Sequence, residues 1–196
     1  MYIHNLEKIL INKSNKNIIF IHTPKCGGTY VSSILSHLKI QNKGHNQAIE
    51  NEEGITFTVI RNPIERFESL LNYRLSEQNH RNDWPKHLIY VYKDENITLN
   101  EIVSKMTNEQ ILGFSPYKTL NYWTTNVDII ITLDELPKML EYFGYTYDTK
   151  LFTPQNISNK IRGKLNEETI NRIKLLYQDD IILYNKVINS AFTLDI

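Results

Sequence analysis

Three short apolar runs, each followed by a segment with apolar residues at helical spacing, organise the chain. The runs are rich in β-branched and aromatic residues, as buried strands are, and cover residues 17–21, 55–60 and 127–132. The helical spacing covers residues 31–38, 64–75 and 136–143. Strands that alternate with helices predict a parallel sheet with right-handed crossovers. We therefore expect one α/β domain over residues 1–196, with helices on both faces of a sheet of four or five strands.

Local signals place further helix ends. Thr98 and Glu101 form a capping-box pattern before an apolar stretch, which predicts the start of a helix. Asp134 is expected to cap the helix that runs to Phe143, and Gly144 to end it. A last helical segment is expected over residues 166–187, and residues 41–53 are expected to be a polar link.

Composition limits the classes of function. The 196 residues carry 22 basic and 22 acidic side chains, so no global positive charge favours nucleic acid as a partner. One cysteine excludes an internal disulfide, and no apolar run is long enough to span a bilayer. Residues 1–16 do not resemble a signal peptide. We expect a cytoplasmic protein or a catalytic domain cut from a longer one, and the oligomeric state is not readable.

The turn between the first strand and the first helix carries the first chemical signal. It reads Pro-Lys-Cys-Gly-Gly-Thr over residues 24–29. Two glycines allow a tight turn and a close ligand, and a helix N-terminus offers N–H groups to an anion. Lys25 adds a mobile positive charge, and Thr29 adds a hydroxyl. These features favour phosphate or sulfate binding, and the alternative is an ordinary strand-to-helix turn.

A second unit of strand, turn and helix repeats this arrangement. Arg61 follows the second strand directly, where ligands bind in open α/β sheets, and Ser69 lies two turns along the next helix. A guanidinium fork and a hydroxyl together suit one phosphate group. The alternative for Arg61 is an ordinary salt bridge at the end of a strand.

Together, Phe-Ile-His-Thr-Pro-Lys-Cys-Gly-Gly-Thr (20–29) and Val-Ile-Arg-Asn-Pro-Ile-Glu-Arg-Phe-Glu-Ser (59–69) resemble the sulfotransferases that use 3′-phosphoadenosine 5′-phosphosulfate (PAPS). The resemblance is to the branch of carbohydrate sulfotransferases that contains heparan sulfate 2-O-sulfotransferase. It implies a P-loop NTPase-like, three-layer fold. It also implies transfer of a sulfuryl group from PAPS to an acceptor hydroxyl, with a saccharide as the preferred acceptor. Protein tyrosine, lipid and small alcohols stay open as acceptors.

The resemblance also implies roles for individual residues. Lys25 would stabilise charge on the leaving oxygen, and the N–H groups from Cys26 to Tyr30 would hold the 5′-phosphate. Cys26 departs from the Thr or Ser that is usual there, which leaves its role open. A basic loop that contains Ser158 and Arg162 could close over the nucleotide or be a plain surface loop. The expected nucleotide-binding residues are Lys25, Cys26, Gly27, Gly28, Thr29, Tyr30, Arg61, Ser69, Ser158 and Arg162. No metal is expected.

An acceptor hydroxyl needs a base, and histidine is suited to that role near neutral pH. His45 is the preferred candidate because relatives often carry a histidine before the second strand, and a solvated loop histidine is the alternative. His22 ends the first strand and is expected to orient the loop. The next candidates for the base are Glu50, Glu52 and Glu53.

Two other functions stay in view. A P-loop kinase would carry Gly-x4-Gly-Lys-Ser/Thr and a strand-end aspartate for magnesium, whereas here the lysine precedes the glycines. A non-catalytic module that binds PAPS or a related nucleotide would keep the fold without the chemistry. Magnesium-dependent ATP turnover would favour the first, and nucleotide binding without transfer would favour the second.

Overall fold

The computed structural model describes residues 2–3, 9, 17–75, 97–113, 118–148, 150, 152 and 163–190. These residues belong to two compact units. The first comprises Met1–Arg61, Leu120–Asn156 and Ile182–Ile196, and the second comprises Asn62–Thr119 and Ile157–Ile181. Each unit is described by itself, and the assignment of residues 1–196 to one domain stays a prediction.

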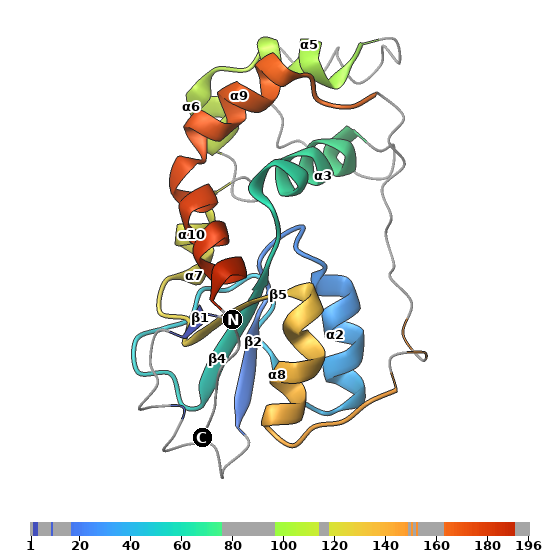
Figure 1. The fold of residues 1–196 in the computed structure, drawn as a ribbon, viewed down its shortest axis with the longest axis vertical. Coiled ribbons are helices and arrows are strands. Elements are labelled where there is room, and N and C mark those ends of the chain that lie inside the picture. The colour runs from blue at the N-terminus through green and yellow to red at the C-terminus, as the bar shows by residue number, and fades with distance from the viewer. Residues whose placement is uncertain are drawn as a thin grey trace. The chain divides into compact units, whose positions relative to one another are not determined.

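A five-stranded sheet forms the centre of the first unit, in the order β1-β5-β4-β2-β3 (Figure 1). The strands are β1 (Tyr2–Ile3), β2 (Ile18–Ile21), β3 (Gln41–Asn42), β4 (Ile55–Ile60) and β5 (Ile129–Thr132). All neighbours pair in parallel except β1, which pairs antiparallel with β5. The expected α/β fold with a central sheet flanked by helices is confirmed, but the sheet is mostly parallel, not fully parallel, because β1 runs antiparallel to β5.

Helices pack on both faces of this sheet (Figure 1). On one face, α2 (Gly28–His37) and α8 (Leu136–Tyr142) bury their apolar stripes against alternate residues of β2, β4 and β5. On the other face, α7 (Leu120–Thr124) and the second half of α10 (Gln178–Asn189) bury Leu120 and Val187 with Ile21, Ile60 and Ile130. Because strand side chains alternate between faces, β2, β4 and β5 each supply both cores.

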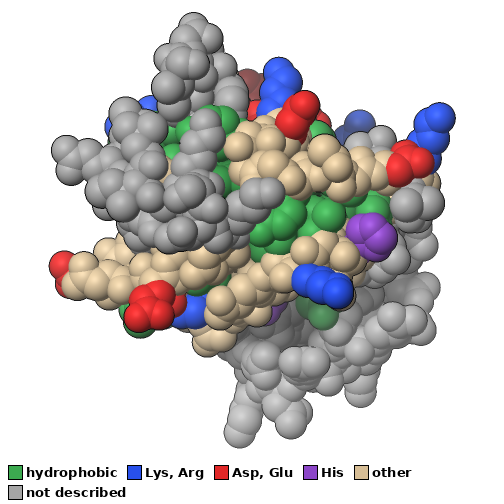
Figure 2. Space-filling view, turned by 90° about the horizontal axis from the view of Figure 1, so that it is seen from below, with side chains coloured by type: hydrophobic (Ala, Val, Ile, Leu, Met, Phe, Trp, Pro, Cys, Tyr) green, Lys and Arg blue, Asp and Glu red, His purple; other side chains and the backbone are tan. Residues whose placement is uncertain are grey.

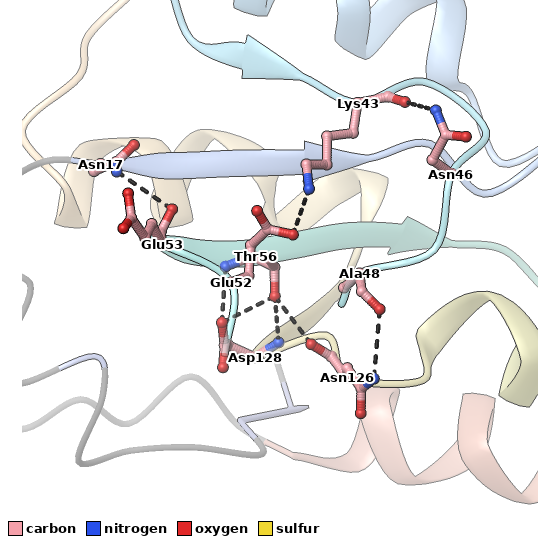
Figure 3. Close-up of polar contacts among 9 residues, drawn as sticks. All are labelled: Asn17, Lys43, Asn46, Ala48, Glu52, Glu53, Thr56, Asn126 and Asp128. Atoms are coloured by element: carbon pink, nitrogen blue, oxygen red, sulfur yellow. Dashed lines mark hydrogen bonds and ion pairs between the residues drawn. The ribbon is translucent and has the colours of Figure 1, made fainter. Parts of the chain in front are cut away.

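A buried polar contact ties β4 to the start of β5 (Figure 3). The Asp128 carboxylate accepts hydrogen bonds from the Thr56 N–H at 2.8 Å and from the Thr56 hydroxyl at 2.9 Å. The Asp128 N–H donates to the Thr56 hydroxyl oxygen at 2.9 Å. Buried polar groups are stable only when paired in this way, so the contact fixes how the two strands align.

The second unit is helical in its described part. It contains α3 (Pro63–Leu75), α5 (Leu99–Ser104), α6 (Asn108–Gly113), α9 (Glu167–Leu176) and the start of α10. Apolar residues of α3, α5, α6 and α9 share one core. The capping box of Thr98 and Glu101 is present at the start of α5, as expected.

Several local expectations differ from the structure. Asp134 does not cap a helix: Thr132 and Glu135 form a capping box on a short 3₁₀ turn, Leu133–Glu135, that leads into α8. The expected helix over residues 166–187 divides into α9 and α10 at Tyr177. The link over residues 41–53 begins with β3, which was not expected, and neither were β1 and α6.

The described surface carries both signs of charge. Figure 2 shows Lys, Arg, Asp and Glu side chains interspersed on the view from below, around apolar side chains at the centre. An anion site in this protein therefore depends on local groups, in keeping with the net charge of zero. Within the described ranges, no helix has the length and apolar character needed to cross a membrane.

Candidate anion site at the carboxyl ends of β2, β3 and β4

The turn between β2 and α2 has an unusual backbone. Lys25 has a φ of 62° and Gly27 a φ of 85°, both in the left-handed region that residues other than glycine seldom adopt. Gly27 is the N-cap of α2 and supplies no side-chain cap, and the first turn of α2 has no acidic residue. No carboxylate in the first turn of α2 therefore balances the positive end of this helix, and such a helix end suits an external anion.

The side chain of Cys26 faces the core. It is 3% exposed and packs with Ile21, Ile60 and Ile130. Its thiol donates a weak hydrogen bond to the Pro24 carbonyl, with a sulfur–oxygen distance of 3.6 Å. The question that the sequence left open is thus answered for the side chain, which packs in the core.

Two basic side chains lie close enough to influence one another. Burial lowers the pKa of Lys25, and the charge of Arg61 lowers it further. β2 and β4 pair in parallel, with Ile21 opposite Thr58. Lys25 follows the carboxyl end of β2, and Arg61 follows the carboxyl end of β4. Ligands of open α/β sheets bind at this edge, and the structure brings together the two cations that the sequence singled out.

His45 lies against His22 at the same edge of the sheet. The two ring centroids are 4.1 Å apart, and His45 Nδ1 is 2.9 Å from the His22 carbonyl oxygen. The Trp123 ring meets the His45 ring in an edge-to-face arrangement, with centroids 6.2 Å apart. Burial, then the charges of His45 and Lys25, lower the pKa of His22 to about 4. His45, the expected base, therefore lies beside His22, whose pKa is lowered in part by the charge of Lys25.

The segment that carries His45 is held by its neighbours (Figure 3). Lys43 forms an ion pair with Glu52, and the Asn46 amide donates to the Lys43 carbonyl at 2.6 Å. The Asn126 amide donates to the Ala48 carbonyl at 3.4 Å. These contacts fix the backbone on both sides of His45, which is what a positioned base requires.

The glutamates that the sequence left as alternative bases lie elsewhere. Glu52 and Glu53 precede the amino end of β4, whereas Lys25 follows the carboxyl end of its parallel neighbour β2. The Glu53 carbonyl accepts from the Asn17 amide at 3.4 Å, next to the start of β2. Glu50 lines a separate pocket of about 660 Å³ with polar residues such as Asn121 and Asn126. His45, in contrast, follows the carboxyl end of β3, the parallel neighbour of β2.

The other expected site residues have different outcomes. Thr29 is exposed on the first turn of α2, and Tyr30 packs partly against the core beneath it. Ser69 lies on α3 in the second unit, and Ser158 and Arg162 lie outside the described residues. The Trp123 ring lies near that of His45, and the side chain of Leu133 lies beside the backbone of Gly27.

Comparisons of the chain with models of protein families, with curated proteins and with solved structures return no match. The function therefore has to be argued from the site. Among the residues that the structure describes, no group of three or more His, Cys, Asp and Glu side chains is arranged to hold a metal ion.

The close contact between His22 and Gly28 generates one prediction. A Cβ atom at Gly28 would lie 1.7 Å from His22 Nε2, so Gly28→Ala must displace the imidazole or the start of α2. We expect this variant to lose about 2 kcal/mol or more of unfolding free energy, measured by urea denaturation. Gly113→Ala is the matched control, because a Cβ there meets nothing within 4 Å. Equal stability of the two variants would contradict the packing described.

The lowered pKa of His22 predicts a pH dependence of stability. The unfolded chain takes up a proton on His22 below about pH 6.5, whereas the folded chain does so only near pH 4. The contribution of His22 to the unfolding free energy is fully present above about pH 6.5 and is lost as the pH falls toward about 4. The side chain is partly exposed, so we expect a loss of about 1–2 kcal/mol. Urea denaturation at each pH should show that the wild type loses this much more unfolding free energy than His22→Gln between about pH 6.5 and 4. Identical losses in the two proteins would refute the lowered pKa of His22.

Proposed function

We propose that this protein is a sulfotransferase with a P-loop NTPase-like fold. It transfers a sulfuryl group from PAPS to an acceptor hydroxyl, and a saccharide is the preferred acceptor. One observation carries the proposal: Lys25, Arg61 and His45 all follow the carboxyl ends of adjacent parallel strands, around a helix N-terminus. A cation, a second cation and a base at one edge suit group transfer from a doubly phosphorylated nucleotide.

The groups present fit the nucleotide. The backbone N–H groups from Cys26 to Tyr30 and the Thr29 hydroxyl would hold the 5′-phosphate. Arg61 would hold the 3′-phosphate. Contacts from Ser69, Ser158 and Arg162 stay predictions of the sequence alone. Two observations support this fit. Burial and then the charge of Arg61 lower the pKa of Lys25, and a bound anion would favour the charged form of this lysine. The first turn of α2 carries no acidic residue that would repel an anion.

The reaction asks three things of the chain. The bond between sulfur and the 5′-phosphate oxygen breaks, the bond between sulfur and the acceptor oxygen forms, and the hydroxyl proton must leave. Lys25 stabilises the charge that develops on the leaving phosphate oxygen, and His45 takes the proton. Positioning and electrostatics dominate the related phosphoryl transfer as well.

The direct test measures nucleotide binding and transfer together. We expect calorimetry to detect binding of 3′-phosphoadenosine 5′-phosphate, and Lys25→Ala to lower sulfuryl transfer about 10²–10³-fold, the usual loss when a transition-state donor is removed. Lys138→Ala, on the exposed side of α8, is the control that keeps the charge change but lies off the site.

Three results would change the proposal. No binding at millimolar nucleotide would reject it, and full transfer by Lys25→Ala would reject the role of the lysine. Tight binding with no transfer across saccharide, peptide, lipid and alcohol acceptors would favour the non-catalytic module.

A further inference from the structure

The hydrogen bonds between β2 and β3 continue past the end of β3. The Lys43 N–H donates to the Phe20 carbonyl at 2.9 Å, and the His22 N–H donates to the Gly44 carbonyl at 2.9 Å. The next acceptor along β2 is the His22 carbonyl, and its partner is the His45 ring nitrogen Nδ1, at 2.9 Å. A side chain thus takes the place that a backbone N–H would have in a regular ladder.

Gly44 makes this exchange possible. Its φ of 61° lies in the left-handed region, which turns the chain out of the ladder immediately before His45. The Asn42 side chain accepts a hydrogen bond from the Gly44 N–H at 2.8 Å and holds the turn. His45 is therefore directed toward β2 by backbone geometry.

The identity of the acceptor determines where the imidazole carries its proton. A carbonyl oxygen only accepts, so Nδ1 of His45 must be the donor in the contact with His22. In a neutral imidazole the other nitrogen, Nε2, then has no proton and keeps its lone pair. Free imidazole in a histidine side chain prefers the opposite tautomer, with the proton on Nε2.

We propose that the His22 carbonyl holds neutral His45 in the Nδ1–H tautomer, so that His45 accepts the proton of the acceptor hydroxyl at Nε2. His22 is a positioning residue, and the proposal rests on the proposed function, which makes His45 the base. It adds the atom that reacts and the group that selects it.

The His22 ring supports this role. It lies with its centroid 4.1 Å from that of His45 and against Gly28 at the start of α2. Because burial, His45 and Lys25 all disfavour its charged form, the His22 ring stays neutral when His45 gains a proton. The pair then carries a single positive charge, on the residue that received the proton.

The test reads the tautomer directly, without turnover. Long-range ¹H–¹⁵N spectra of the uniformly ¹⁵N-labelled chain are recorded at about pH 8, above the usual histidine pKa. His45→Gln identifies the resonances of His45 among the six histidines. We expect Nδ1 of His45 at the shift of a protonated ring nitrogen and Nε2 at the shift of a bare one. A protonated Nε2, or the averaged shifts of a free side chain, would overturn the proposal.

A pair of glycine variants tests the cause. Gly44→Ala adds a Cβ that meets nothing within 4 Å, so its effect comes from backbone strain at a φ of 61°. We expect the His45 shifts to move toward those of the Nε2–H tautomer, while Gly113→Ala leaves them unchanged. Unchanged shifts in folded Gly44→Ala would overturn the role of the turn, and the wild-type spectrum decides the tautomer even if this variant does not fold.

The outcomes separate the two proposals. A protonated Nε2 on His45 in a chain that binds 3′-phosphoadenosine 5′-phosphate would overturn the role of the His22 carbonyl and leave the sulfotransferase assignment standing. A protonated Nδ1 in a chain that does not bind the nucleotide would overturn the sulfotransferase assignment and, with it, the catalytic role of Nε2.

Discussion

The parallel pairing of β2 with its neighbours β3 and β4 is the constraint on which the candidate site depends. It places the residues after all three strands at one edge of the sheet, so Lys25, His45 and Arg61 converge although the first and the last are 36 positions apart in the chain. The apolar core on each face of the sheet and the Thr56–Asp128 contact hold β4 in this register. A change in that register would move Arg61 away from Lys25.

The electrostatics of the site follow from the same arrangement. The net charge of the chain is zero, yet Lys25 and Arg61 lie close enough for one to lower the pKa of the other at the start of α2. Burial, His45 and Lys25 lower the pKa of His22 to about 4, so the His22 ring is neutral near pH 7. Lys25 and Arg61 therefore give this part of the sheet a local positive charge, although the net charge of the chain is zero.

Much of this edge could be predicted from local sequence, because each part has a local cause. The run of β-branched and aromatic residues gives β4 its observed bounds, Ile55–Ile60, and the glycines mark the turn before α2. β3 was missed because it has only two residues, both polar, and takes its conformation from pairing with β2. The break at Tyr177 was missed because the helical spacing of apolar residues continues through it.

The contacts that organise the site are less accessible to sequence reasoning. His22 and His45 are 23 positions apart, and Thr56 and Asp128 are 72 apart, so no spacing rule links them. Cys26 could be noticed as unusual, but that its thiol faces Ile21 and Ile130 depends on which way the turn directs it. His45 was preferred over the glutamates by resemblance, and its role as the base stays a prediction. The structure shows that His45 follows the carboxyl end of β3, whereas Glu52 and Glu53 precede the amino end of β4.

The central claim is that the turn before α2 and Arg61 hold the two ends of one ligand. Calorimetry on the wild-type chain can compare 3′-phosphoadenosine 5′-phosphate with adenosine 5′-phosphate, which lacks the 3′-phosphate. We expect the doubly phosphorylated nucleotide to bind at least about tenfold more tightly, because it makes one additional charge-assisted phosphate contact. Equal affinity for the two nucleotides, or binding of neither, would contradict it.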